Sequence, residues 1–505
     1  MQLPNSLAEL EKANSELSER REASAEWFVT CGVQRLLTLK KEEMEFRLER
    51  GRLYFAYWGR EGARLWRVTG YETNSDSVTL QAERRFGADK QVITLMPRAT
   101  AREGKIELAT ARLDLCARLG QLALAHDESA EIEQINLSQG ATPGEPGPYA
   151  RIALRQRRLR IYATGPVVPL EPSRIDAFLA ASLLWFQRKK SDHTQYWLIV
   201  PESGAGIVGE RLALLREGWR EAITLLAHDA AWQTLTLQTV PTLHELLGQA
   251  VKTVKLPFTA RETDWADALA RSYPRAVDVV RSRHGATLRW RGLPFARVRR
   301  VLREKRVWFG VDGKRRQILC DKTQGEWDKL IAELHAHRRP DAPDRRHELY
   351  RARSEAWLET LLRQDISKLD PGLVIAPLHA QFRALPGAAR PIDLLALRQD
   401  GRLAVIELKT TEDREHALQA ADYWLRVEQQ RRRGHLRAAR LFGDTEIASE
   451  PALVYLVAPL LSFHRDFNTL ATMLNPAIEA FRFDLNEDWR KGVRVARRMR
   501  VGEKS

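Results

Sequence analysis

The stretch that decides the fold of the C-terminal third reads Arg390-Pro-Ile-Asp-Leu-Leu-Ala-Leu, then a short turn, then Leu403-Ala-Val-Ile-Glu-Leu-Lys409. Two apolar segments joined at an Asp-Gly turn predict a β-hairpin, because this dipeptide favours tight hairpin turns. Each apolar strand nevertheless carries charge: Asp393 lies on the first strand, and Glu407 and Lys409 lie on the second. An unpaired charge in a buried strand is costly, so these residues need a physical reason to be there.

Strand periodicity places the three charges close together. Side chains alternate between the two faces of a strand, so Glu407 and Lys409 project from the same face. The turn should bring Asp393 across the ladder to about 5 Å from Glu407. Two facing carboxylates repel, and a divalent cation relieves the repulsion, since Mg²⁺ takes one or two carboxylates together with phosphate and water oxygens. Lys409 could then orient or deprotonate a water that attacks phosphorus, or offset the developing charge. The alternative is an ordinary ion pair and a turn-capping Asp393.

Together with the neighbouring sequence, these residues resemble the signature of the PD-(D/E)xK nuclease superfamily, which has the restriction-endonuclease-like fold. That signature is an acidic residue on an early helix, an Asp on a central strand and Glu-x-Lys on the next strand. The RecB-like branch adds Gln-x-x-x-Tyr on the following helix. The matching positions, within about residues 350–500, are Glu355, Asp393, Glu407-Leu408-Lys409, Gln419 and Tyr423.

The resemblance implies a nuclease that hydrolyses phosphodiester bonds of DNA with Mg²⁺, or with Mn²⁺ as a substitute. It implies Asp393, Glu407 and the backbone carbonyl of Leu408 as metal ligands. Gln419 and Tyr423 lie one turn apart on one helix face, and by resemblance they hold the DNA backbone or orient the strand of Glu407. Core packing is the alternative for this pair.

The helical acid is the least defined member of the signature. Glu355 and Glu359 share one face of a helix expected over residues 347–365. Glu355 is the first choice for a water-mediated metal contact, with Glu359 as the alternate.

Composition agrees with a nucleic-acid partner. The chain has 505 residues, a formal net charge of +15 and a sequence pI near 9.8, and such an excess of positive charge favours polyanions, DNA first. Three well-separated cysteines without a CxxC pair argue against a zinc finger and fit a reducing cytosol. The start of the chain lacks a signal-peptide pattern and no apolar run spans a bilayer. We therefore expect a cytoplasmic protein that does not bind membranes, with an oligomer as an open alternative.

The chain length predicts several domains in an α/β multidomain protein. Alternation of period two from residue 43 to residue 98 predicts a small antiparallel β domain after a polar, solvated helix. Helices, one of them over residues 210–226, and buried strands predict a mixed α/β region. The Pro- and Arg-rich segment 335–347 predicts a linker. The expected domains are 1–105 (polar helix and β domain), 106–250 (mixed α/β), 251–340 (α/β with basic strands and the linker) and 341–505 (restriction-endonuclease-like α/β domain).

Two classes of function compete. The first is the DNA nuclease, acting in DNA repair or defence, with the N-terminal domains selecting the substrate. The second is a catalytically inactive nuclease-fold protein that binds nucleic acid, or a scaffold in a DNA-processing complex.

Overall fold

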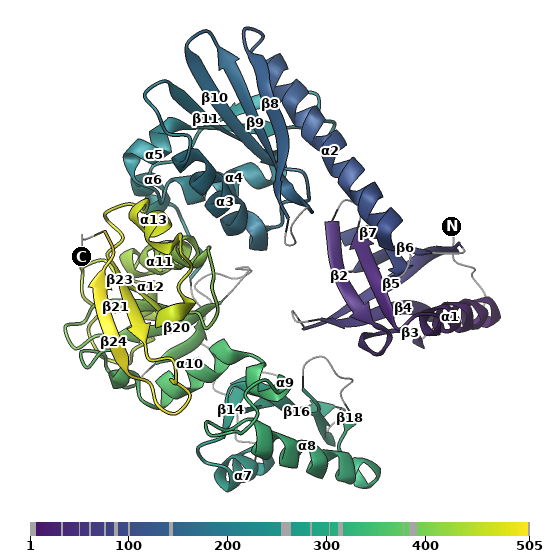
Figure 1. Cartoon of the computed structure of the whole chain (residues 1–505). Helices are drawn as coiled ribbons and strands as arrows, with labels where there is room; N and C mark the ends of the chain where they lie inside the picture. Colours follow the sequence, from purple (N-terminus) through teal and green to yellow (C-terminus); the bar gives the residue numbers. More distant parts are fainter. Residues whose placement is uncertain are drawn as a thin grey trace. The chain divides into compact units, whose positions relative to one another are not determined.

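The computed structural model describes residues 7–31, 34–49, 51–59, 62–74, 77–84, 89–98, 101–140, 145–253, 264–282, 285–301, 304–311, 317–376, 378–382 and 391–502. Within these residues, helices are combined with four β-sheets (Figure 1), which confirms the predicted α/β class with several sheets. The chain divides into two compact units. The first contains residues 1–154, 163–169 and 310–316, and the second contains residues 155–162, 170–309 and 317–505.

The first sheet is antiparallel, with the strand order β2-β1-β7-β6-β5-β4-β3. Its strands are β1 (Glu26–Cys31), β2 (Gln34–Lys40), β3 (Met44–Glu49), β4 (Arg52–Gly59), β5 (Gly62–Thr73), β6 (Val78–Arg84) and β7 (Asp89–Pro97). Helix α1 (Leu7–Glu22) packs on this sheet and buries Leu10, Ala13 and Leu17 in the core that contains Phe55 and Trp66. The expectation of a solvated helix is therefore wrong, because three residues at helical spacing make one apolar face.

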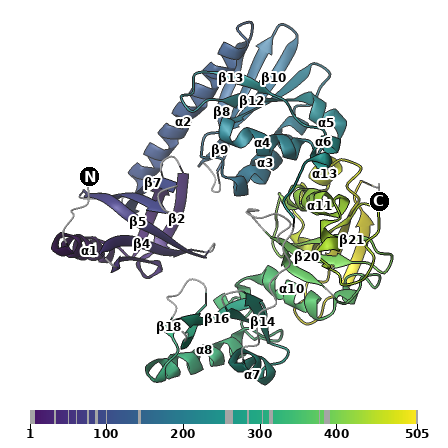
Figure 2. The same ribbon diagram turned by 180° about the vertical axis from the view of Figure 1, so that it is seen from behind.

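The second sheet has the order β13-β12-β11-β10-β9-β8. The elements here are α2 (Ala101–His126), β8 (Glu131–Gln139), β9 (Pro146–Gln156), β10 (Leu159–Pro166), α3 (Ile175–Gln187), β11 (Thr194–Pro201), α4 (Glu202–Leu212), α5 (Glu217–Ala222), β12 (Ile223–His228), β13 (Leu235–Gln238) and α6 (Leu243–Gly248). Strands β11 and β12 are parallel, and the crossover helix α4 packs on both (Figure 2). The single helix expected over 210–226 is wrong: α4 ends at Leu212, the short helix α5 follows after a break, and the apolar residues from Ile223 onward form strand β12 of the sheet.

The third sheet is antiparallel and follows the chain from β14 to β18. Its elements are α7 (Asp264–Ser272), β14 (Val277–Ser282), β15 (Gly285–Trp290), β16 (Leu293–Val301), β17 (Glu304–Phe309), β18 (Gln317–Ile318) and α8 (Gln324–His337). Helix α8 covers it through Trp327, whose ring contacts Phe295 and Phe309. The expected linker begins inside α8, and Arg338 just after that helix is fully buried. This part of the segment is packed against its neighbours.

The C-terminal sheet has the order β19-β20-β21-β22-β23-β24. Its elements are α9 (Glu348–Arg351), α10 (Ser354–Gln364), β19 (His379–Phe382), β20 (Ile392–Leu397), β21 (Leu403–Leu408), α11 (His416–Arg432), α12 (His435–Ala438), β22 (Leu453–Pro459), α13 (Phe467–Thr472), β23 (Ala480–Leu485) and β24 (Val495–Arg500). The strands from β19 to β21 are antiparallel, β21 to β23 are parallel, and the basic tail adds β24 antiparallel to β23. Helix α11 makes the crossover from β21 to β22 and packs on both strands.

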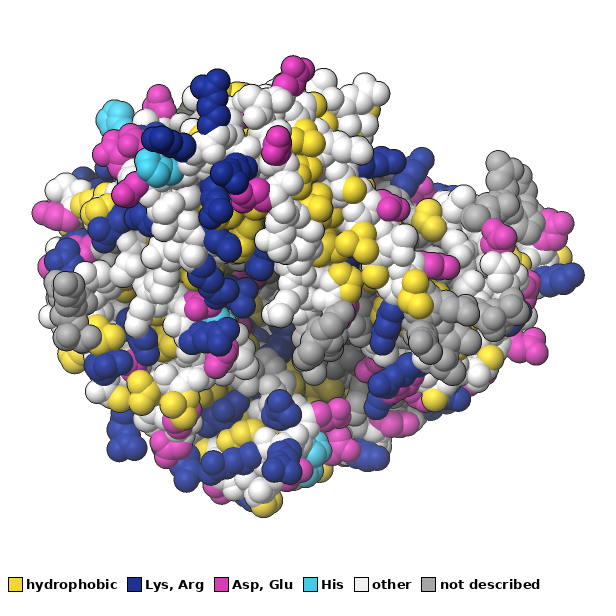
Figure 3. Space-filling model, turned by 45° about the horizontal axis from the view of Figure 1, so that its top comes forward, with side chains coloured by type: hydrophobic (Ala, Val, Ile, Leu, Met, Phe, Trp, Pro, Cys, Tyr) yellow, Lys and Arg dark blue, Asp and Glu magenta, His cyan; other side chains and the backbone are white. Residues whose placement is uncertain are grey.

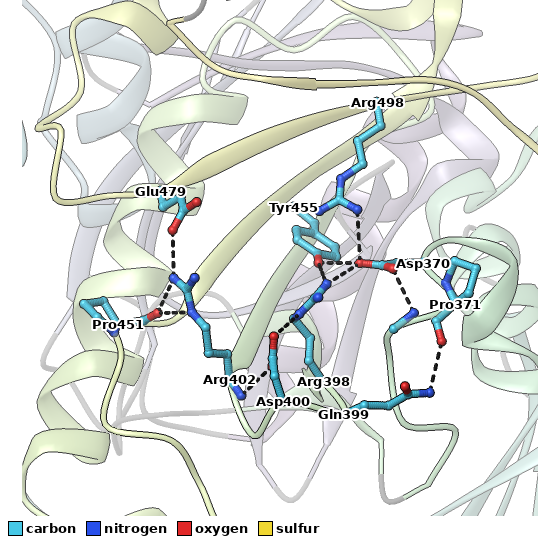
Figure 4. Close-up of polar contacts among 11 residues, drawn as sticks. Asp370, Pro371, Arg398, Gln399, Asp400, Arg402, Pro451, Tyr455, Glu479 and Arg498 are labelled. Carbon is cyan, nitrogen blue, oxygen red and sulfur yellow. Dashed lines mark hydrogen bonds and ion pairs between the residues drawn. The ribbon is translucent and has the colours of Figure 1, made fainter.

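A polar network fixes the turn of the β20–β21 hairpin (Figure 4). Asp370 accepts hydrogen bonds from the Tyr455 hydroxyl at 2.6 Å and from Arg398 at 2.7 Å. Arg398 also donates to Asp400 at 3.1 Å, and Gly401 follows with a φ of +82°. These bonds hold the end of the hairpin that lies away from Asp393 and Glu407, so the strand register is set there.

The β15–β16 turn meets the backbone of α10 at Gly292, and this approach excludes a side chain. A Cβ at Gly292 would overlap the backbone of Ala356 and lie 2.7 Å from the Trp357 nitrogen, at a φ of +82°. We expect Gly292→Ala to lower the free energy of unfolding by about 3 kcal/mol or more, measured by urea denaturation. Gly434→Ala is the matched control, because Gly434 also has a positive φ but open space around it, so only the strain of about 1 kcal/mol applies. Equal losses in the two variants would contradict the close approach.

Candidate active site

The hairpin brings its charged residues to one end of two paired strands. The register pairs Leu394 with Ile406 and Leu397 with Leu403. One step beyond Leu394, the Asp393 carboxylate accepts a hydrogen bond from the backbone N–H of Leu408 at 2.9 Å. This bond holds Asp393 beside the strand that carries Glu407. Arg390, which precedes this strand in the sequence, lies outside the described residues.

The two faces of the central strand β21 have different neighbours. Ile406 and Leu408 join the core that contains Trp357 of α10. Lys409, just past the strand end, contacts α11 on the other face, where its Nζ donates to Gln419 Oε1 at 2.8 Å. Every residue of β21 is buried, so the charges next to it are shielded from solvent.

Lys409 is the centre of a chain of polar contacts. Its Nζ lies 3.1 Å from Glu407 Oε1 and 3.1 Å from Asp413 Oδ2, in addition to its bond to Gln419. The amide group of Gln419 in turn donates to the Tyr423 hydroxyl at 3.0 Å. An ammonium has three donors, and here each has a partner. Burial acts to lower the pKa of Lys409, but the charges of Glu407 and Asp413 outweigh it and raise the pKa above its ordinary value.

Glu407 keeps one oxygen without a partner. Its Oε2 atom is buried and forms no hydrogen bond with the residues that the structure describes. Burial and the charge of Asp393 raise the pKa of Glu407 well above its ordinary value, although Lys409 opposes the shift. Burial also raises the pKa of Asp393 to about 6, against the hydrogen bond from Leu408. Burying a carboxylate oxygen without a hydrogen-bond donor lowers the free energy of unfolding by about 1–3 kcal/mol, and by more when the group is charged.

The two candidate helical acids have different surroundings. Glu355 lies in the first turn of α10, and its charge contributes to raising the pKa of both Asp393 and Glu407. Glu359 is buried one turn later and lies 3.4 Å from Arg289 and 3.9 Å from Arg363. Glu359 is therefore engaged by two arginines, although its charge, like that of Glu355, also raises the pKa of Asp393.

Two residues at this site were not among the sequence candidates. Asp413 holds Lys409 from the side opposite to Glu407, and an acid four residues after the signature lysine was the only sequence signal for it. His416 is buried, stacks on Phe463 at 5.8 Å between ring centroids, and its Nε2 lies 3.2 Å from the backbone oxygen of Glu407. Burial lowers the pKa of His416 to about 3, so its ring is neutral and acts as packing behind the Glu407 strand.

The carboxylates at this site are the kind of ligand that a hard divalent cation prefers, but they do not lie close together. Asp393, Glu407 and Glu355 supply carboxylate oxygens, which such cations prefer, and the unpartnered Glu407 Oε2 is the atom that a cation would satisfy. Within the described parts of the chain, no three His, Cys, Asp or Glu side chains lie close enough together to form a complete metal site. A bound cation would therefore need ligands from outside this set, such as water and phosphate oxygens.

Comparisons with protein-family models, with curated proteins and with solved structures found no match to this chain. The assignment of the site consequently depends on its own geometry.

None of the helices in the described ranges is long and apolar enough to cross a membrane. Lys and Arg side chains are spread over the face drawn in Figure 3, with Asp and Glu among them.

The raised pKa of Asp393 makes a prediction about stability. Between about pH 4 and 6 the folded protein keeps a proton on Asp393 that the unfolded chain has lost. The free energy of unfolding therefore falls as the pH rises from about 4 to 6, and this loss of stability is complete above about pH 6. Asp393→Asn removes the buried charge and keeps the acceptor for Leu408. We expect it to raise the free energy of unfolding by about 1–3 kcal/mol near pH 7.5, measured in urea with EDTA, and by less near pH 4.5.

Asp400→Asn at the other end of the hairpin provides a control of opposite sign. Burial acts to raise the pKa of Asp400, but the N–H of Arg402 and the guanidinium of Arg398 lower it overall. Its loss should therefore destabilise the protein near neutral pH. A destabilised Asp393→Asn variant at that pH would show that the Asp393 charge is not a burden in the folded state.

Proposed function

We propose that this protein is a metal-dependent nuclease with a restriction-endonuclease-like C-terminal domain, and that its substrate is DNA. The observation that carries the proposal is the buried Glu407 Oε2, which has no donor in the described structure, although the other oxygen of the same carboxyl lies 3.1 Å from Lys409 Nζ. Burial and the charge of Asp393 disfavour the ionised form of Glu407, and a divalent cation bound to this carboxylate would stabilise that form.

The order of the site residues supports the same proposal. Glu355 lies on α10, Asp393 on β20, Glu407 at the end of β21, and Gln419 and Tyr423 on α11. This is the order of an early helix, a central strand, the next strand and the following helix in the signature that the sequence resembles. The hydrogen bonds from Lys409 to Gln419 and on to Tyr423 join the last two motifs into one network.

In the proposed reaction Asp393, Glu407 and the Leu408 carbonyl would hold Mg²⁺, with Mn²⁺ as a substitute. The cation would neutralise phosphate charge and lower the pKa of a coordinated water. Asp393 is kept in place by the Leu408 N–H, and Glu407 by its contact with Lys409. Lys409 carries its proton between two carboxylates, so the role that fits it is to stabilise negative charge at the phosphate. Glu355 is a half-buried acid suited to a water-mediated contact.

Cleavage assays with single- and double-stranded DNA test this function directly. We expect cleavage with Mg²⁺ or Mn²⁺ and none with EDTA. Asp393→Asn and Lys409→Met should lower kcat/KM by about a thousandfold or more, since each removes charge needed in the transition state. Lys368→Met is the matched control, because that lysine is exposed and lies 3.8 Å from Asp365, away from the site residues in the sequence.

Two outcomes would contradict the proposal. Cleavage that persists at full rate in both site variants would remove these residues from the reaction. Binding of DNA without cleavage under either metal would favour the second class of function, a catalytically inactive nucleic-acid-binding protein or scaffold.

Asp413 is a positioning residue in this scheme, because it touches Lys409 and not the substrate. Asp413→Asn should lower kcat about tenfold with little change in KM, since Lys409 loses one of its two carboxylate partners. Asp413→Glu should recover part of the activity. Glu412→Gln is the control at the neighbouring exposed acid. An unchanged kcat in Asp413→Asn would show that Glu407 and Gln419 alone position the lysine.

A further inference from the structure

A cavity of about 400 Å³ lies beside the turn between β15 and β16. Its wall is formed by the turn after α7, the β15–β16 turn and the segment that follows α8. The described lining contains one acidic residue, Asp341, and five basic ones, which are Arg275, Arg291, His335, Arg338 and Arg339. Positive charge therefore dominates the cavity.

Arg338 forms the buried base of this charge. It is fully buried, and its guanidinium donates to the backbone carbonyls of Trp290, Leu349, Ala352 and Arg291 at 2.6–2.8 Å. Four of its five N–H donors are used in this way. Among the described residues no carboxylate forms an ion pair with Arg338, so its hydrogen bonds are satisfied while its charge is not neutralised.

The neighbours of Arg338 add to its charge. Burial lowers the pKa of Arg338 to about 9, and the positive charges of Arg490, Arg291 and Arg353 lower it in the same direction. Aromatic rings offset part of this cost: Arg338 lies 4.8 Å from the Trp357 ring centroid, and Arg490 lies 4.2 Å from that of Trp489. Such contacts contribute about 1–2 kcal/mol each, whereas burying an unpaired charge costs several. The aromatic contacts therefore compensate only part of the cost of burying these positive charges.

Arg291 is held in a conformation that does not suit its side-chain type. It has a φ of +43°, and Gly292 follows at +82°, which is the two-residue hairpin turn that favours Asn-Gly. An arginine there costs about 1 kcal/mol relative to asparagine or glycine. Its Nε atom is buried and donates to no atom of the described residues. The strained backbone at Arg291 is therefore not offset by a hydrogen bond from its Nε to any described residue.

We propose that this cavity is a binding site for a phosphate group, with Arg291 as its main side-chain donor and Arg338 as the buried charge beneath it. Phosphate is favoured over a carboxylate because it carries more charge and more acceptor oxygens, and several guanidinium groups can share them. Asp341 is the one lining acid, and it lies 3.8 Å from Arg339. The source of the phosphate is a nucleic-acid strand, an assignment that rests on the proposed function, whereas the phosphate site itself does not.

The substitution Arg291→Asn tests the site without breaking the fold, because asparagine suits the left-handed conformation that Arg291 now occupies. In the full chain with EDTA, calorimetric titration with inorganic phosphate should show binding to the wild type and a loss of affinity of about tenfold or more in Arg291→Asn. Arg157→Asn is the matched control, an exposed turn arginine with a φ of +52°. Asp341→Asn should bind phosphate more tightly, because it removes the opposing charge.

A second arm identifies the source of the phosphate. Anisotropy of a labelled single-stranded oligonucleotide, again with EDTA, should show weaker binding by Arg291→Asn and a log–log salt slope smaller by about 0.7. Absence of phosphate binding by the wild type, or equal binding by Arg291→Asn and Arg157→Asn, would overturn the site. Loss of phosphate binding with unchanged oligonucleotide binding would overturn the strand as its source. Neither readout uses cleavage, so a failure of the nuclease activity would be seen separately.

Discussion

The contact between the buried Glu407 carboxylate and the buried Lys409 ammonium, 3.1 Å apart at the end of the central strand of the C-terminal sheet, is the interaction on which the candidate site depends. Neither charge would be stable there alone, because desolvation of an unpaired ion costs several kcal/mol. Asp413 and Gln419 are the other two partners of Lys409, whereas one oxygen of Glu407 has no donor among the residues that the structure describes. Among the described residues the positive partner is therefore fully satisfied, whereas the negative partner is not.

Helix α10 connects this site to the rest of the second unit. Trp357 fills the core beneath the hairpin, Glu355 adds charge beside Asp393, and Glu359 is held by Arg289 of β15. The Gly292 turn packs directly on the backbone of the same helix. The third sheet and the helix that carries Glu355 are therefore packed directly against each other.

Two clusters of opposite charge are maintained in this unit at a cost to stability. Burial, and to a lesser extent the neighbouring acids, raise the pKa of Asp393; burial, and to a lesser extent the neighbouring arginines, lower the pKa of Arg338. A chain selected for stability alone would replace such groups with apolar side chains, since removing a buried charge is often neutral or favourable. Strain or destabilisation that persists at a cavity or cleft is typical of residues kept for binding or chemistry. A cation and a phosphate are the ligands that would relieve the two clusters.

The sequence by itself determined the hairpin, the strand of β22 and the helix that carries Gln419 and Tyr423, because local apolar periodicity and an Asp-Gly turn specify these elements without distant contacts. It also placed Glu407 and Lys409 on one face, since the two-residue repeat of a strand is a local property. Only the tertiary structure decided that α1 is half buried, that residues 223–228 form a strand, and that Arg338 is a packed residue of the expected linker. It likewise brought Arg289 to Glu359 and Asp413 to Lys409. Each of these depends on which partner element lies alongside, and the burial and ion pairing that result are set by contacts between residues far apart in the chain.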